Sequence, residues 1–142
     1  MAGCKSKKNA VKKPEEKKVT TMPMSEVNSV QKQKAYDAGT RILMTCNTSK
    51  FKPFTSSEAT ESVIRNTTQK RLTETCLKFR LKYGDFKEIN LVEVVKEKGT
   101  ENTIYRYKAL YEKKIANKEL RVTMNEKNQV EGIKSLDWVD AY

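Results

Sequence analysis

The sequence of 142 residues contains no histidine, and this absence excludes several kinds of active site. Serine hydrolases, cysteine proteases and most catalytic zinc centres use an imidazole as a base, an orienting group or a ligand. The 3 cysteines show no CxxC spacing, so a cysteine-only zinc site is not expected. The 5 glycines are too scattered for a phosphate-binding loop. We therefore expect no metal, no cofactor and no catalytic residue of these classes.

Long apolar runs are also absent. No stretch of about 18 apolar residues exists to span a bilayer, and no apolar signal-peptide core precedes Cys4 in the chain as given. Ala2-Gly3-Cys4 nevertheless resembles the end of a bacterial lipoprotein signal, in which a lipidated cysteine becomes the new N-terminus. This resemblance implies that the apolar part of the signal was removed and that Cys4 is the lipid attachment site. The alternative is an initiator methionine followed by an ordinary cysteine.

Residues 1–24 contain almost nothing that a core could bury. They hold seven lysines and two glutamates, which is +5 of the formal net charge of +11 and leaves +6 for the rest of the chain. This composition predicts a disordered, lysine-rich tether that ends near Pro23. The same charge would suit contacts to phosphates, so a small cytoplasmic nucleic-acid-binding protein is the alternative. No aromatic residue lies between these lysines to stack on bases, and we favour the tether.

Residues 25–142 are predicted to form a single α+β domain whose first half is helical. Three helices are expected: a long one over residues 26–46 with Ser25 as its N-cap, a short one starting at residues 55–58, and a third from residues 66–68 to Tyr83. Gly84 suits the left-handed position that ends a helix.

Cys46 and Cys76 lie on the apolar stripes of the first and third predicted helices. If these helices pack together in an oxidising compartment, the two thiols are able to form a disulfide. Closing a loop of about 30 residues would stabilise the domain by about 3 to 4 kcal/mol in the chain-entropy model. Two free thiols buried in the core remain the alternative, because the sequence supplies neither geometry nor compartment.

After Gly84 the hydrophobic period changes from 3.6 to 2, which predicts strands. Four strands are expected, over residues 86–95, 103–113, 118–125 and about 129–138, with a bulge or bend at Gly132. Their short connections indicate a curved antiparallel meander. In the second strand Tyr105, Tyr107 and Tyr111 should face the helices, and Arg106 and Lys108 the opposite side.

The stretch TIYRYKALYEKKIANKELRVTMNEKNQVEGIKS resembles the C-terminal half of small exported domains of the nuclear transport factor two-like superfamily, whose fold is shared with cystatin-like proteins. The likeness includes the strand ending in Tyr111-Glu112-Lys113 and covers roughly residues 25–138. It implies N-terminal helices packed on a curved four-stranded sheet, in a cone-like shape. It also implies that two copies of the domain are able to pair through the sheet.

The cone implied by this resemblance encloses a cavity in many relatives. Five aromatic residues are the candidate lining: Phe79, Tyr105, Tyr107, Tyr111 and Trp138. The alternative is that these rings simply fill the core. A basic outer surface is expected from Arg106 and Lys108, together with Lys78, Arg80 and Lys82 near the third helix. Such a surface would suit acidic partners such as lipid headgroups or anionic polysaccharide.

These features favour a lipid-anchored, exported and non-enzymatic binding module in the bacterial cell envelope. The resemblance to lipoproteins implies a periplasm-facing membrane anchor, because lysines rather than acids follow Cys4, as in relatives that face the periplasm. The ligand, whether a small molecule, a peptide or a protein, is not identified by the sequence. An enzyme that uses tyrosine and carboxylate groups in the pocket is a further alternative, and it would need a buried carboxylate with a raised pKa beside a tyrosine.

Overall fold

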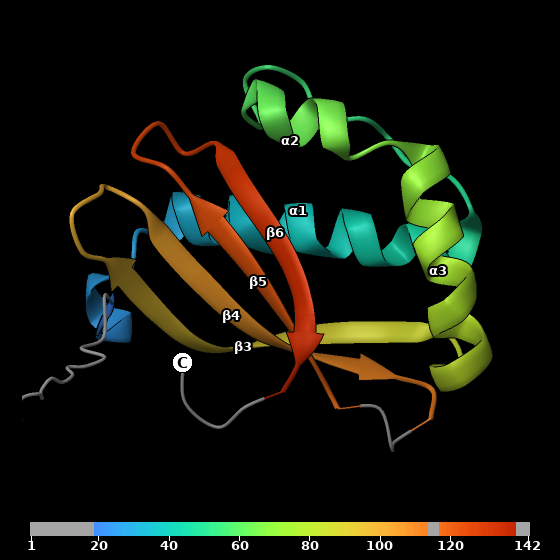
Figure 1. The fold of residues 1–142 in the computed structure, drawn as a ribbon. Helices are drawn as coiled ribbons and strands as arrows, with labels where there is room; N and C mark the ends of the chain where they lie inside the picture. The colour runs from blue at the N-terminus through green and yellow to red at the C-terminus, as the bar shows by residue number, and fades with distance from the viewer. Residues whose placement is uncertain (1–18, 114–116, 139–142) are drawn as a thin grey trace, which may run out of the picture.

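The structure is a computed structural model, and it describes residues 19–113 and 117–138. The elements in these ranges are β2 (Val19–Thr21), the short 3-10 helix η2 (Met24–Glu26), α1 (Ser29–Thr48), α2 (Glu61–Asn66), α3 (Gln69–Tyr83), β3 (Phe86–Glu97), β4 (Thr103–Tyr111), β5 (Lys118–Met124) and β6 (Val130–Asp137). The predicted α+β class is thus confirmed (Figure 1). No helix in the described part of the chain has the length and apolar character needed to cross a membrane.

The strands form one antiparallel sheet in the order β2-β3-β4-β5-β6. The last four strands are those predicted from the sequence. The sheet has five strands rather than four because Val19 pairs with Glu97 and Thr21 pairs with Val95. Valine and threonine are β-branched and favour strands, and the end of the long strand β3 offers them an edge. The predicted tether therefore ends too late, since residues 19–24 belong to the fold.

The helix boundaries differ from those predicted at both ends of α1, which ends at Thr48 rather than at residue 46, and at the start of α2. α1 begins at Ser29 rather than at residue 26, because Asn28 caps it by accepting a hydrogen bond from the Gln31 backbone N–H. α2 begins at Glu61 with Thr60 as its N-cap, whereas residues 55–58 form a turn outside any helix. α3 ends as predicted before Gly84, whose φ is 81°.

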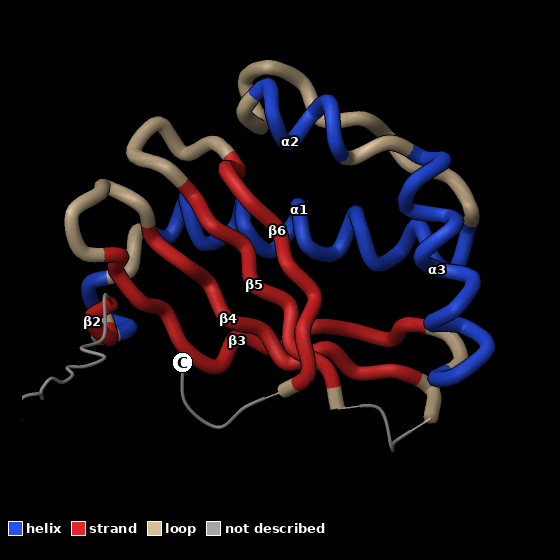
Figure 2. The backbone as a smooth tube through the Cα atoms, viewed as in Figure 1, coloured by secondary structure: helices blue, strands red, loops and turns tan. Residues whose placement is uncertain are grey.

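α1 lies across one face of the sheet, here called the helix face (Figure 2). Small residues allow the close approach: Ala35 is fully buried, and a Cβ at Gly39 would lie 2.9 Å from Cδ2 of Leu120. Tyr105 and Tyr107 are buried in this core with Leu120, Val122 and Met124, which confirms the face predicted for the two tyrosines.

The opposite side of the sheet is here called the outer face. Every second side chain of each strand points to it. Arg106 is fully buried there, although charged residues on an outer face are expected to be solvated. The irregularity predicted at Gly132 lies beside it, because Thr123 pairs with Gly132 and Met124 with Val130, which leaves Glu131 as the extra residue. β6 is the last strand of the sheet, and α3 stands at the end of the sheet where β3 begins (Figure 1).

Candidate functional site: a groove between α3 and β6

A groove with a volume of about 350 Å³ lies between α3 and β6, with parts of α1 and β5 in its walls. Its apolar walls are formed by Ile42, Leu43, Leu72, Phe79, Leu120 and Ile133. Polar side chains lie among them, including Asn66 from the end of α2, Thr67 from the connection to α3, Thr75 from α3, and Ser135 from β6. The volume falls within the range of small-molecule sites, and the mixture of apolar walls with a few polar groups is typical of them.

The groove exists because α3 is fastened to the body at its middle and at its end. Cys76 on α3 forms a disulfide with Cys46 on α1, with an S–S distance of 2.03 Å. The sequence left open whether these thiols pair, and the structure brings them together. Near the end of α3, the ring of Tyr83 lies 5.7 Å from that of Tyr111 between their centroids. The first half of α3 makes no comparable aromatic contact among the described residues, and it borders the groove.

Arg71 is the cation of this groove. It lies in the first turn of α3, three residues after the N-cap Thr68. The next residue, Leu72, packs against the core. Among the residues that the structure describes, its guanidinium has no carboxylate within ion-pair distance and no side-chain hydrogen bond. The other five arginines of the chain each have a carboxylate partner: Arg41, Arg65, Arg80, Arg106 and Arg121. An unmatched guanidinium beside apolar walls suits a carboxylate or another planar anion.

Of the aromatic residues predicted to line the pocket, Phe79 is the one that lines this groove. Tyr105 is fully buried between sheet and α1, where its hydroxyl donates a hydrogen bond of 2.7 Å to Oε1 of Gln31. Tyr111 is buried in the aromatic cluster beside Phe86. Tyr107 borders a separate open depression of about 380 Å³ between α1 and β3. The predicted tyrosines thus belong mainly to the core.

Trp138, which was also predicted to line the pocket, is not among the residues that line this groove. Its ring lies under two cations of the outer face, 5.0 Å from Cζ of Arg106 and 5.3 Å from Nζ of Lys108. The reason is the two-residue period of β6: Ile133 and Ser135 line the groove, so Trp138 is on the other side. The same alternation would have identified Ile133 and Ser135, which sequence reasoning missed.

Arg106 does not contribute to a basic surface, contrary to expectation. Its Nε and Nη2 each donate a hydrogen bond of 2.8 Å to Glu119, and its Nη1 donates to Glu93. Arg121 donates to Glu119 as well. Burial would raise the pKa of Glu119, but the hydrogen bonds from Arg106 and Arg121 outweigh it and leave that pKa lowered. This ionic network is complete within the chain, so it stabilises strand pairing rather than recruiting an anion.

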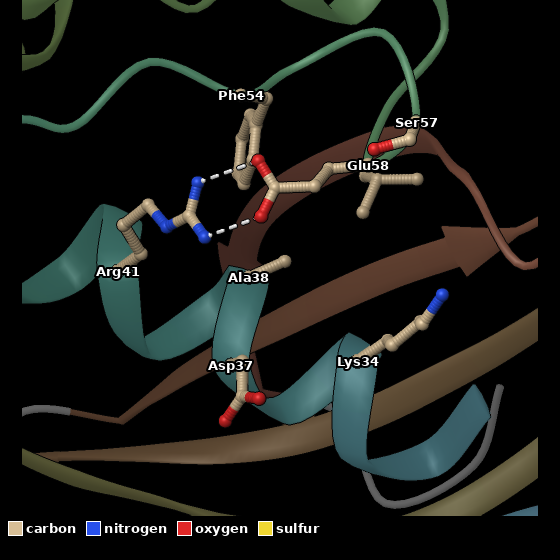
Figure 3. Close-up of a pocket in the computed structure, with 8 residues that line it drawn as sticks. Lys34, Asp37, Ala38, Arg41, Phe54, Ser57 and Glu58 are labelled. Carbon is tan, nitrogen blue, oxygen red and sulfur yellow. Dashed lines mark hydrogen bonds and ion pairs between the residues drawn. The ribbon is translucent and has the colours of Figure 1, made fainter. Parts of the chain in front are cut away.

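A smaller cavity of about 170 Å³ lies between α1 and the turn at residues 55–58 (Figure 3). Lys34 and Arg41 are the two cations in its lining, and Arg41 is neutralised because it donates hydrogen bonds of 3.2 and 2.8 Å to the two carboxylate oxygens of Glu58. The hydrogen bonds from Arg41 lower the pKa of Glu58 to about 2. Arg41 also lies over the ring of Phe54, 4.7 Å from its centroid. We interpret these contacts of Arg41 as structural, because they hold the turn at residues 55–58 against α1.

The described groups with a shifted pKa include no carboxylate whose pKa is raised. The described carboxylates whose pKa departs from its ordinary value all have it lowered, namely Glu58, Glu119 and Asp137. Burial raises the pKa of Tyr105 and of Tyr111 to about 12, which keeps both phenols protonated. In the described part of the chain, no group of three or more acidic or cysteine side chains is arranged to hold a metal ion.

Comparison of the chain with protein-family models, with curated proteins and with solved structures found no match. The likeness to the nuclear transport factor two-like superfamily therefore stays a prediction. Cys4, the predicted site of lipid attachment, lies outside the described residues.

Proposed function

We propose that this domain is a non-enzymatic binding module that takes an amphipathic anion into the groove between α3 and β6. The observation that carries the proposal is Arg71, the arginine without a carboxylate partner among the described residues, at the wall of an apolar groove. The ligand class that fits is a carboxylate attached to a single aliphatic chain or ring.

The two parts of such a ligand would be bound by different residues. Leu72, Phe79 and Ile133 offer apolar surface to the chain, and covering it removes that surface from water. The carboxylate would accept two parallel hydrogen bonds from the guanidinium of Arg71, the geometry in which arginine binds carboxylates best. Asn66 and Thr75 lie in the same lining and supply further donors.

The proposal also places the domain at a membrane of the bacterial cell envelope, held by lipid on Cys4. Its support is Ala2-Gly3-Cys4 followed by the lysine-rich stretch, together with the Cys46–Cys76 disulfide, which is favoured in oxidising compartments. Mass spectrometry of the native protein tests this part separately. A chain that is whole and unacylated inside the cell would contradict it.

The groove is tested by displacement of a fluorescent fatty acid, dansylamino-undecanoic acid, from the full chain. We expect decanoate to displace the probe and decanol to displace it at least tenfold less well, since only the carboxylate pairs with Arg71. Arg71→Glu should weaken binding of the probe at least tenfold. Lys70→Glu makes the same change of charge on the neighbouring residue outside the groove lining and should change affinity less than twofold.

Two results would contradict the proposed ligand class. One is a probe that does not bind, and the other is an equal loss of affinity in the Arg71→Glu and Lys70→Glu variants. An equal loss would mean that the general positive charge of the chain, and not the groove, attracts the anion. Affinity for short DNA or RNA that falls steeply with salt, combined with no probe binding, would instead favour the nucleic-acid alternative.

A further inference from the structure

The side of α3 that faces away from the sheet carries two exposed leucines. Leu77 is 62% exposed and Leu81 is 75% exposed, the two highest values among the exposed large hydrophobic side chains in the described part of the chain. They are four residues apart and therefore lie on the same side of the helix, one turn from each other. A helix that serves only to cover the body would place leucines inward.

The disulfide prevents α3 from turning these leucines inward. Cys76 is buried on the side of α3 that packs against α1, and Leu72 and Phe79 on the same side pack against the core. If α3 rotated far enough to bury Leu77, the Cys46–Cys76 disulfide would have to break. The exposed leucines are thus a fixed feature of the surface.

Basic residues predominate around the leucines, and the one acid of the helix, Glu74, lies three residues before Leu77 on the same side. α3 contains five basic residues and one acid, a net charge of +4. Arg80 is paired with Asp85, at 3.1 Å. Lys70, Lys78 and Lys82 have no carboxylate within ion-pair distance among the described residues. Lys78 and Lys82 each follow a leucine directly, so they border the apolar pair.

We infer that this face of α3 docks on a bilayer that contains anionic lipids. Leu77 and Leu81 would enter the boundary between headgroups and acyl chains, while Lys78 and Lys82 contact lipid phosphates. Two leucines with a basic border suit this partner by charge and by size. A stable protein interface generally buries more than about 1,000 Å², which is much larger than two side chains offer. This surface is separate from the groove, so the inference does not depend on the groove ligand.

The test uses the full chain without acylation and vesicles of phosphatidylglycerol and phosphatidylcholine in equal parts, with binding measured by flotation. The double variant Leu77→Ser/Leu81→Ser should bind at least fivefold more weakly than the original chain. The matched control Val30→Ser/Val92→Ser removes two exposed valines on α1 and β3 and should bind within twofold of the original. The lysines of residues 1–18 are the same in all three proteins, so their attraction to the vesicles cancels.

A second measurement reports insertion rather than attraction alone. In the Leu81→Trp variant, tryptophan emission should shift to shorter wavelength when anionic vesicles are added, and the original chain, with only Trp138, should show a smaller shift. Vesicles of pure phosphatidylcholine should bind all variants at least tenfold more weakly. The inference is overturned if the serine variants bind equally, or if the new tryptophan shows no shift. Self-association that requires Leu77 and Leu81, without vesicle binding, would also overturn it in favour of a second copy as the partner.

Discussion

Two arginines on opposite sides of the sheet differ in their partners: Arg106 lies on strand β4, and Arg71 lies on helix α3. On the outer face Arg106 is buried, and Glu93 and Glu119 satisfy its hydrogen bonds. On the helix side Arg71 is exposed beside an apolar groove, and no carboxylate of the described residues forms an ion pair with it. A buried charge that has all its hydrogen-bond partners is part of the fold. A charge that has no carboxylate partner and lies beside apolar surface is available to a ligand.

The largest effect should come from breaking the outer-face network. Glu119→Ala leaves the buried guanidinium of Arg106 without its main partner, and removing one member of a buried pair costs about 3 to 5 kcal/mol. Urea unfolding at neutral pH measures the change in free energy of unfolding. Asp137→Ala removes the partner of Lys118 in an ion pair whose carboxylate is 87% exposed, so its effect should be far smaller. Equal effects of the two variants would refute the structural role assigned to the network.

The helix side should be most sensitive to the disulfide. Cys46→Ala/Cys76→Ala removes a bridge across 30 residues of sequence and should lower the free energy of unfolding by about 3 to 4 kcal/mol in the chain-entropy model. The double variant should also bind the fluorescent fatty acid more weakly, because α3 is no longer held beside the groove. Unfolding curves that do not change when a reductant is added to the original chain would show that the bridge does not form.

The smallest effect compares two buried tyrosines on the helix face. Tyr105→Phe leaves Oε1 of Gln31 without its donor and should cost about 1 to 2 kcal/mol. Tyr107→Phe removes a buried hydroxyl that has no hydrogen-bond partner among the described residues, so it should be neutral or slightly stabilising. Thermal unfolding of the two variants side by side measures the difference. A greater loss for Tyr107→Phe would mean that its hydroxyl has a role that the contacts do not reveal.

Much of the fold was accessible from local sequence patterns. The end of α3 at Gly84 and the four strands from β3 to β6 follow from turn residues and hydrophobic period. The start of α1 was predicted three residues too early, because Ser25 and Asn28 are both good N-caps and propensity does not distinguish them. Strand β2 was missed because three residues form a strand only when a neighbouring edge accepts them.

The candidate site was less accessible. Phe79 and the pairing of Cys46 with Cys76 were among the possibilities that the sequence raised, but Arg71 and Ser135 were not. Arg71 stands out as a candidate site residue only after the ion pairs of the other arginines are known, because each of them has a carboxylate partner. Partners of that kind lie on other strands or helices, as Glu58 does for Arg41.

The sequence by itself determined which side chains share a strand face and where most of the elements begin and end, because these depend on neighbours a few residues away. It also determined that chemistry requiring histidine is excluded. Only the tertiary structure decided which charges are satisfied: Arg106 meets Glu119 across two strands, while Arg71 meets no described acid. Charge pairing depends on distance in space, and residues that are 13 apart in the chain come into contact only after the strands have paired.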